Sequence, residues 1–171
     1  MTDATDRLVR HIASLRYEDL PSAAIEAAKI LALDTLGICV SGSAAPYADV
    51  VASTAAAWGA GREAHVLGRG DVLPAASAAL VNAFQAHSQE WDCVHEPAVV
   101  HALATVQSAV LAAAERRGGL SGREFLLALA AGVDASATIG LGSRSPLKFF
   151  RPATAGTFGV VAALAKLERF D

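Results

Sequence analysis

Apolar residues recur at helical spacing along most of the chain, and breaks in this pattern divide it into segments. The first segment shows the pattern clearly, because Leu8, Ile12 and Leu15 are three or four positions apart. The expected buried side of the second segment consists of large apolar residues: Ile25, Leu33, Leu36 and Val40. Helices are expected at about residues 6–14, 22–40, 47–58, 74–87, 102–117, 121–140 and 154–168. The pattern therefore predicts an all-α bundle of six to seven helices.

Local signals support these boundaries. Alanine, the strongest helix former, makes up roughly a quarter of the residues. Ser121 and Glu124 have the spacing of a capping box, which predicts a helix start there, and Gly118 and Gly119 end the preceding helix. Only residues 64–67 are expected to form a short extended stretch.

Length and composition restrict the class of protein. The chain has 171 residues, of which 53% are hydrophobic and 18% charged, so we expect one ordered domain spanning residues 1–171. Cys39 and Cys93 are too few for a disulfide framework. The net charge is −3 and the basic residues are scattered, which argues against a nucleic-acid or anionic-membrane partner.

No segment has the pattern of a membrane anchor or leader. The longest uncharged apolar run, Pro97–Ala114, is mostly alanine and is too weakly apolar for a spanning helix. Met1–Arg10 contains Asp3 and Asp6 and no apolar centre, unlike a signal peptide. We therefore expect a cytoplasmic protein without a membrane partner.

Acid–base side chains concentrate in an irregular segment between two predicted helices. They are His87, Glu90, Asp92, Cys93, His95, Glu96 and His101, which include three of the five histidines. A loop held between two helices is a common place for a site, because the helices fix its ends. This segment is the candidate site.

His101 is the leading candidate for proton transfer. It lies just before a predicted helix, whose dipole disfavours the imidazolium form and so favours a neutral base. Glu90 and Asp92 are expected to orient groups or exchange protons beside it. His87 shares a helical face with apolar residues, so it is either a half-buried hydrogen-bonded residue or, like His95, a substrate contact.

A metal site is an alternative use of the same segment. Four residues offer nitrogen and oxygen ligands within a short span: His87, Glu90, Asp92 and His95. Their spacing matches no established zinc motif, so we expect no bound metal.

A second candidate is the basic connection before the last helix. It contains Arg144, Lys148 and Arg151, which are suited to holding carboxylates. A solvated basic turn explains the same residues equally well.

Four stretches resemble the N-terminal helical part of the MmgE/PrpD family, which includes 2-methylcitrate dehydratase and cis-aconitate decarboxylase. They are A-L-D-T-L-G at 32–37, A-A-L-V-N-A-F-Q-A-H at 78–87, His101 with V-L-A-A-A-E at 110–115, and T-A-G-T-F-G-V-V-A-A-L-A-K-L-E-R-F-D at 154–171. The resemblance implies a lyase that acts on a small polycarboxylate by proton transfer next to a carboxylate, without a metal or organic cofactor.

The resemblance also suggests residue roles. His101 falls on the family's first catalytic histidine, although Ala102 replaces the usual proline. Glu90 takes the place of the first aspartate of the acidic loop, and Val94 that of its threonine. Arg151 stands where a second histidine is usual. Since arginine cannot act as a base at ordinary pH, we expect it to bind a substrate carboxylate.

The family resemblance covers its N-terminal part only. A usual member is more than twice as long and carries a further α+β domain, which we expect to be absent here. The expected partner is a second copy in a homodimer or the missing C-terminal part. The alternative to an enzyme is a non-catalytic helical scaffold, or one fragment of a split enzyme.

Overall fold

The computed structural model describes residues 3–143, 148 and 150–170. These ranges contain seven α-helices, two short 3-10 turns and one small hairpin, which confirms the predicted all-α class. In chain order the elements are α1 (Ala4–Ser14), η1 (Tyr17–Asp19), α2 (Ser22–Gly42), α3 (Ala48–Ala57), β1 (Ala64–His65), β2 (Val72–Leu73), α4 (Ala75–His87), η2 (Glu96–Ala98), α5 (Ala102–Arg116), α6 (Gly122–Gly142) and α7 (Arg151–Glu168).

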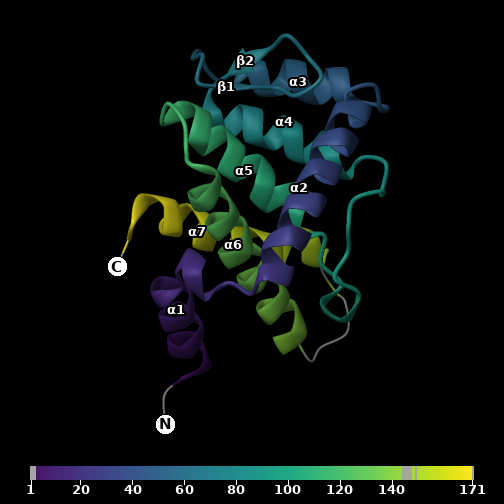
Figure 1. Cartoon of the computed structure of the whole chain (residues 1–171). Helices are drawn as coiled ribbons and strands as arrows, with labels where there is room; N and C mark the ends of the chain where they lie inside the picture. The colour runs from purple at the N-terminus through teal and green to yellow at the C-terminus, as the bar shows by residue number, and fades with distance from the viewer. Residues whose placement is uncertain (1–2, 144–147, 149, 171) are drawn as a thin grey trace.

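Helix α5 lies in the middle of the molecule (Figure 1) and packs against α2, α4, α6 and α7. Its Val106 and Val110 are fully buried, and Leu129 of α6 is 1% exposed against them. The hairpin and α3 lie at one end, next to α4, and α1 lies at the other end near the N-terminus (Figure 1). The hydrophobic core of the protein is thus built around α5.

Helices α6 and α7 approach each other through glycine. A Cβ added at Gly159 of α7 would overlap the Ser136 hydroxyl and lie 2.5 Å from the carbonyl oxygen of Gly132, both on α6. Only a residue without a side chain permits this spacing of the two backbones. The close crossing holds α7 against the centre of the bundle.

The buried side of α2 differs from the prediction. Leu33 is 72% exposed and Val40 is 50% exposed, whereas Ala32, Thr35 and Cys39 are buried. Small residues face the bundle because α2 crosses α4 so closely that a Cβ at Gly42 would overlap the backbone of Gln85. The assignment of Leu33 and Val40 to the buried side was therefore wrong.

Helix α6 begins at the predicted capping box. The Glu124 amide donates to Ser121 Oγ at 3.2 Å, and the Ser121 amide donates to the Glu124 carboxylate at 3.0 Å. By length and hydropathy, α6 is the one described helix that is able to cross a membrane. Half of its most apolar window is nevertheless buried inside the protein, as in the core helix of a globular domain.

Buried amides attach the hairpin to α4. Asn82 Nδ2 donates to the His65 carbonyl at 3.0 Å, and its Oδ1 accepts from the Leu67 amide at 2.9 Å. Gln85, which is fully buried, donates to the Leu67 carbonyl at 2.8 Å. These bonds fix the second half of α4, which ends at His87, where the candidate site begins.

Candidate functional site

The segment from Ser88 to His101 connects α4 to α5 and contains two residues in the left-handed region. Glu90 has φ 55° and Val99 has φ 53°, although neither is glycine. This conformation is strained for a β-branched residue such as Val99. The His95 amide donates to the Val100 carbonyl at 2.9 Å, which closes the second turn. The two turns bring the chain back so that α5 starts beside the end of α4.

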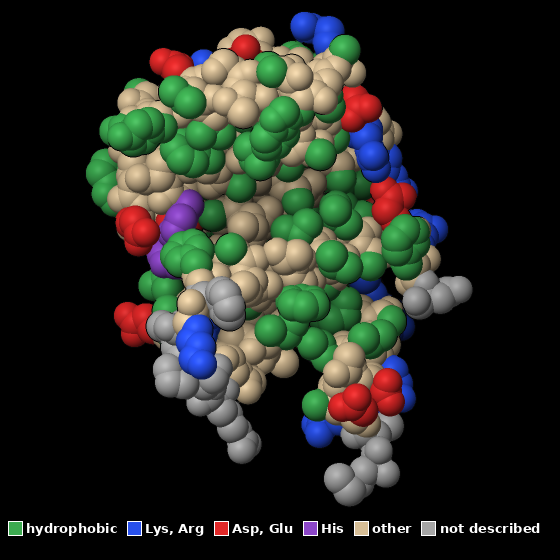
Figure 2. Space-filling view, turned by 180° about the vertical axis from the view of Figure 1, so that it is seen from behind, with side chains coloured by type: hydrophobic (Ala, Val, Ile, Leu, Met, Phe, Trp, Pro, Cys, Tyr) green, Lys and Arg blue, Asp and Glu red, His purple; other side chains and the backbone are tan. Residues whose placement is uncertain are grey.

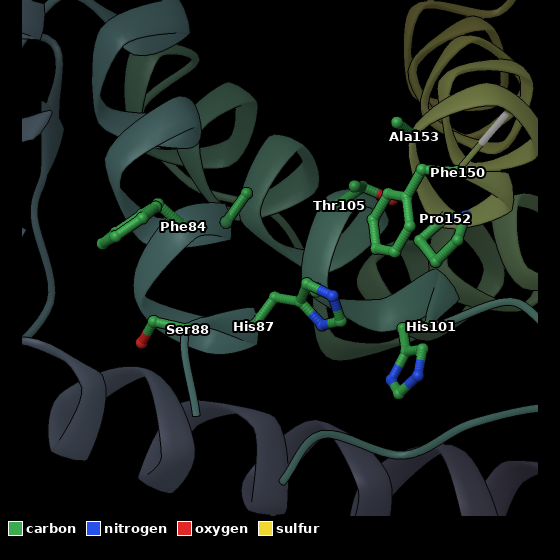
Figure 3. Close-up of a pocket in the computed structure, with 10 residues that line it drawn as sticks. Phe84, His87, Ser88, His101, Thr105, Phe150, Pro152 and Ala153 are labelled. Carbon is green, nitrogen blue, oxygen red and sulfur yellow. The ribbon is translucent and has the colours of Figure 1, made fainter. Parts of the chain in front are cut away.

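This path places one carboxylate between two imidazoles. Asp92 Oδ1 lies 3.0 Å from His87 Nδ1, and Asp92 Oδ2 lies 3.3 Å from His101 Nδ1. The same His101 nitrogen also hydrogen-bonds the Asp92 carbonyl at 3.1 Å. The ring centroids of His87 and His101 are 4.8 Å apart (Figure 3). The structure thus assembles His87, Asp92 and His101 into one cluster, called the His–Asp–His cluster below.

The two imidazoles line a small cavity between α4, α5 and the start of α7. Its volume is about 220 Å³, and most of its remaining walls are apolar. Phe150 lies 5.5 Å from His87, centroid to centroid, and covers the cavity from the α7 side (Figure 3). Apolar walls lower the local dielectric constant, which strengthens electrostatic interactions beside them.

Burial makes the charges of the cluster interdependent. The Asp92 side chain is only 1% exposed, and those of His87 and His101 are 22% and 16% exposed. The hydrogen bond that His87 donates to Asp92 raises the pKa of His87, although burial works in the opposite direction. His87 therefore holds a proton at a higher pH than a free histidine does.

The cluster suits proton transfer and also offers metal ligands. Within the described ranges, His87, Asp92 and His101 present ligand atoms that all lie within 4.8 Å of one another. This trio differs from the set weighed from the sequence, because His101 takes part in place of Glu90 and His95. Imidazole nitrogen and carboxylate oxygen are ligands for zinc and similar ions, so these three residues are the ones able to hold one.

Comparison with known proteins decides the family. The sequence model of the MmgE/PrpD N-terminal domain matches residues 6–171. The chain belongs to the MmgE/PrpD family. Over 80% of the present chain, it is 28% identical to a cis-aconitate decarboxylase of Aspergillus terreus. It is 27% identical to the cis-aconitate decarboxylases of Homo sapiens and Mus musculus, over 95% and 97% of the present chain.

The chain spans about a third of the length of these relatives, between 29% and 36%. It corresponds to the N-terminal domain of an MmgE/PrpD protein.

Glu90, which the family resemblance suggested as a site residue, lies at the rim of the cluster. Its side chain is 71% exposed, and its Oε1 is 3.5 Å from His87 Nε2. It is thus near the imidazole without being enclosed with it. Val94 is 45% exposed and offers no hydroxyl.

Arg151 begins α7 and contacts the backbone of two other segments. Its Nη1 donates to the Ala98 carbonyl at 3.2 Å and to the Gly140 carbonyl at 3.5 Å. The structure places it directly between Phe150 and Pro152, which line the cavity. Arg151 therefore fastens α7 to the loop that precedes His101 and to the end of α6.

The other predicted site residues lie outside the cluster. His95 Nδ1 accepts from the Ala98 amide at 3.2 Å and so caps η2. Lys148 is exposed, and Arg144 lies outside the described residues. The structure thus groups His87, Asp92, His101 and, at the rim, Glu90, and places His95 and Lys148 elsewhere.

Two residues of the cavity wall were missed in the sequence. Thr105 lies one helical turn after His101, so its position on α5 was a usable signal. Phe150 had no such signal, because it precedes α7 in an irregular connection.

Both cysteines are poor nucleophiles near neutral pH. Burial raises the pKa of Cys39 to about 11. Burial also raises the pKa of Cys93, assisted by the negative charges of Asp92 and Asp34.

Proposed function

We propose that the chain is the proton-transfer part of a cytoplasmic lyase that acts on a small polycarboxylate without a metal or organic cofactor. The reaction is a dehydration or a decarboxylation next to a carboxylate. The observation that carries this proposal is the buried Asp92, which is bound to an imidazole on each side at the wall of a cavity. Membership of a family whose curated relatives include cis-aconitate decarboxylases supports the same class of substrate.

His101 acts as the proton-transfer residue in this proposal. Its Nδ1 is engaged by Asp92, so the Nδ1–H form is favoured and the Nε2 lone pair is left for the substrate. It also occupies the N-cap position of α5, at the positive end of the helix dipole. Asp92 fixes the tautomer and orientation of the ring, and Glu90 closes the rim.

Substrate carboxylates require cationic partners. A guanidinium has five N–H donors, and among the described residues Arg151 donates hydrogen bonds through Nη1 only. The remaining donors of Arg151 are proposed to bind one carboxylate near the cavity. Lys148 and His95 are proposed as outer contacts for a second carboxylate, because both side chains are exposed.

Deuterium exchange tests this proposal directly. The 171-residue chain is incubated in D₂O with cis-aconitate and, separately, with citrate, and carbon-bound deuterium and products are followed by NMR. We expect turnover or exchange with one of the two, and a loss of at least about 100-fold in His101→Gln. The matched control is His65→Gln, since His65 is also paired with a carboxylate, Glu115 at 2.6 Å, but lies away from the cavity.

A calorimetric melt measures binding independently of turnover. Saturation to about 100 times Kd stabilises a protein by about 2.7 kcal/mol, which corresponds to a rise of about 5–10 °C for a chain of this size. Citrate is compared with acetate, which has one carboxylate only. A chain that neither responds to citrate or cis-aconitate nor exchanges protons overturns the proposal.

A second candidate function is a helical scaffold or one fragment of a split enzyme. An apolar groove of about 1120 Å³ between α1, α6 and α7 favours it. Phe158, Val161 and Phe170 line this groove and are 58%, 61% and 70% exposed. Hydrophobic side chains gather around the hollow beside the N-terminal projection (Figure 2).

Apolar surface of this extent is typical of an interface. We propose that the groove is covered by a second copy in a homodimer or by a C-terminal part of the protein. Light scattering across a concentration series tests the homodimer. A stable, inactive dimer would favour the scaffold.

A further inference from the structure

Both imidazoles of the His–Asp–His cluster contact Asp92, but His87 hydrogen-bonds its carboxylate and His101 its backbone carbonyl. Each directs Nδ1 towards Asp92, so each has Nε2 left for other partners. His87 Nε2 is buried and has no hydrogen-bond partner among the described residues. Its nearest charged atom is Glu90 Oε1 at 3.5 Å. A buried polar atom without a partner is costly, which makes this nitrogen a candidate for contact with a ligand.

One carboxylate can neutralise only one of the two imidazoles. With ring centroids 4.8 Å apart and little exposure, two imidazolium charges would repel each other strongly. The site therefore has the charge balance for one proton shared between two rings, and its geometry gives the two rings different partners.

The surroundings decide which ring takes the proton. His87 faces the carboxylates of both Asp92 and Glu90, and these favour its charged form. His101 faces Asp92 and the N-terminal end of α5, whose partial positive charge opposes a second one. These contacts thus favour His87 as the ring that holds the proton.

We propose that His87 is a second catalytic residue, which donates its Nε2 proton while His101 serves as the base. This inference rests on the proposed function and assigns the acid that the lyase reaction needs. In a dehydration, His101 Nε2 takes the proton from carbon, the C–O bond breaks, and the His87 proton leaves with the hydroxyl as water. In a decarboxylation, the C–C bond breaks, CO₂ departs, and the His87 proton adds to the carbon that keeps the electron pair. After a dehydration His101 releases its proton to solvent, and after either reaction solvent returns a proton to His87.

A proton-donating His87 and a purely structural His87 need different properties of the side chain. A purely structural His87 would need only its Nδ1 bond to Asp92, which an amide side chain can replace. A proton donor needs a titrating Nε2 that faces the cavity, and His87 lines the cavity together with His101 (Figure 3). His87→Gln keeps a hydrogen-bonding group and removes the titrating one, so it tests the difference.

The first experiment is an NMR pH titration of the ¹⁵N-labelled 171-residue chain, which requires no turnover. We expect the His87 imidazole to stay protonated above the ordinary histidine range, because its hydrogen bond to Asp92 raises its pKa. In Asp92→Asn His87 should lose that upward shift. His65 provides the internal reference, because it is paired with Glu115 outside the cluster. Equal titration of both rings, unchanged in Asp92→Asn, would overturn the proposal.

The second experiment measures turnover and exchange with cis-aconitate and citrate in His87→Gln and His87→Gly, with folding checked by circular dichroism. We expect both variants to lose about 100- to 10,000-fold in rate. Added imidazole should restore part of the rate to His87→Gly, which loss of structure alone would not allow. A His87→Gln variant that is active within about twofold of the wild type, with the same pH profile, would refute the role of His87 and leave the proposed function intact.

Inactivity of the wild-type chain, combined with the expected titration, would instead refute the proposed function alone. A competing use of the same atoms is metal binding, which is tested by adding Zn²⁺ during the NMR titration. Stoichiometric Zn²⁺ that shifts both rings and increases turnover would replace the proton-donor role of His87 with that of a ligand.

Discussion

The crossing of α6 and α7 predicts that one substitution, glycine to alanine, has opposite effects in two helices. Alanine is favoured over glycine inside a helix by up to about 1 kcal/mol. At Gly37 of α2 a Cβ would meet nothing within 4 Å, so this gain is realised in full. At Gly159 of α7 the Cβ would overlap the Ser136 hydroxyl and press against the backbone carbonyl of Gly132.

The magnitude follows from which atoms are able to move. The Ser136 hydroxyl can rotate, but the Gly132 carbonyl belongs to α6 and can retreat only if the helices separate. Overpacking of this kind costs about 1–3 kcal/mol, and we take the upper end because the obstacle is backbone. After the gain in helix propensity, Gly159→Ala is expected to lose about 2 kcal/mol. For a chain of this size that lowers the Tm by about 4–8 °C, whereas Gly37→Ala should raise it by about 2–4 °C.

Thermal unfolding followed by circular dichroism and calorimetry measures both variants beside the wild type. The two variants are matched, since each exchanges the same residues inside a helix. If Gly159→Ala melts at or above the wild-type temperature, the close contact between α6 and α7 is wrong. If Gly37→Ala is also destabilised, the exposed position assigned to Gly37 is wrong.

Three further predictions concern the site and the caps. Asp92→Ala leaves two buried imidazoles without their carboxylate, and we expect a loss of about 3–5 kcal/mol in urea unfolding; a loss below 1 kcal/mol would contradict the burial of this group. Because the pKa of His87 is raised on folding, its stabilisation is complete below the unfolded pKa and is lost as the pH rises through the folded pKa. The difference in unfolding free energy between the wild type and His87→Asn should therefore be larger at pH 5.5 than at pH 8.5, and equal differences would show that His87 is not paired. Ser121→Ala removes the cap of α6 and should cost about 1 kcal/mol, measured as a fall in Tm of about 2–4 °C; an unchanged Tm would mean that the cap is dispensable.

The helices were predictable because their signals are local and repeated. The capping box at Ser121 placed the start of α6 within one residue. Helix α7 starts at Arg151, three residues before the prediction, because Pro152 fits the first turn and the basic residues obscured that start. Residues 64–67 were expected to be extended, but the partner strand at residues 72–73 was not, since two residues show no periodicity.

The buried face of α2 and the geometry of the site required the structure. Hydrophobicity alone assigned Leu33 to the core, but close helix crossings select small residues, and that selection depends on the neighbouring helix. The concentration of acid–base residues identified His87, Asp92 and His101 as candidates. It did not predict that the three side chains converge on one another. Their convergence depends on left-handed turns at Glu90 and Val99, where the sequence has no glycine to indicate them.

The His–Asp–His cluster is encoded by one short, continuous stretch of chain. All three of its members lie between residues 87 and 101, and the loop that joins them closes over 13 intervening residues. A loop of this length closes at low entropic cost, so the cluster can assemble as soon as α4 and α5 pair, before distant segments fold. The proton-transfer groups are therefore encoded together, whereas the cavity walls and the proposed carboxylate contact at Arg151 come from α4, α5 and α7. One short stretch of chain can thus vary the proton chemistry while distant helices vary the shape of the cavity.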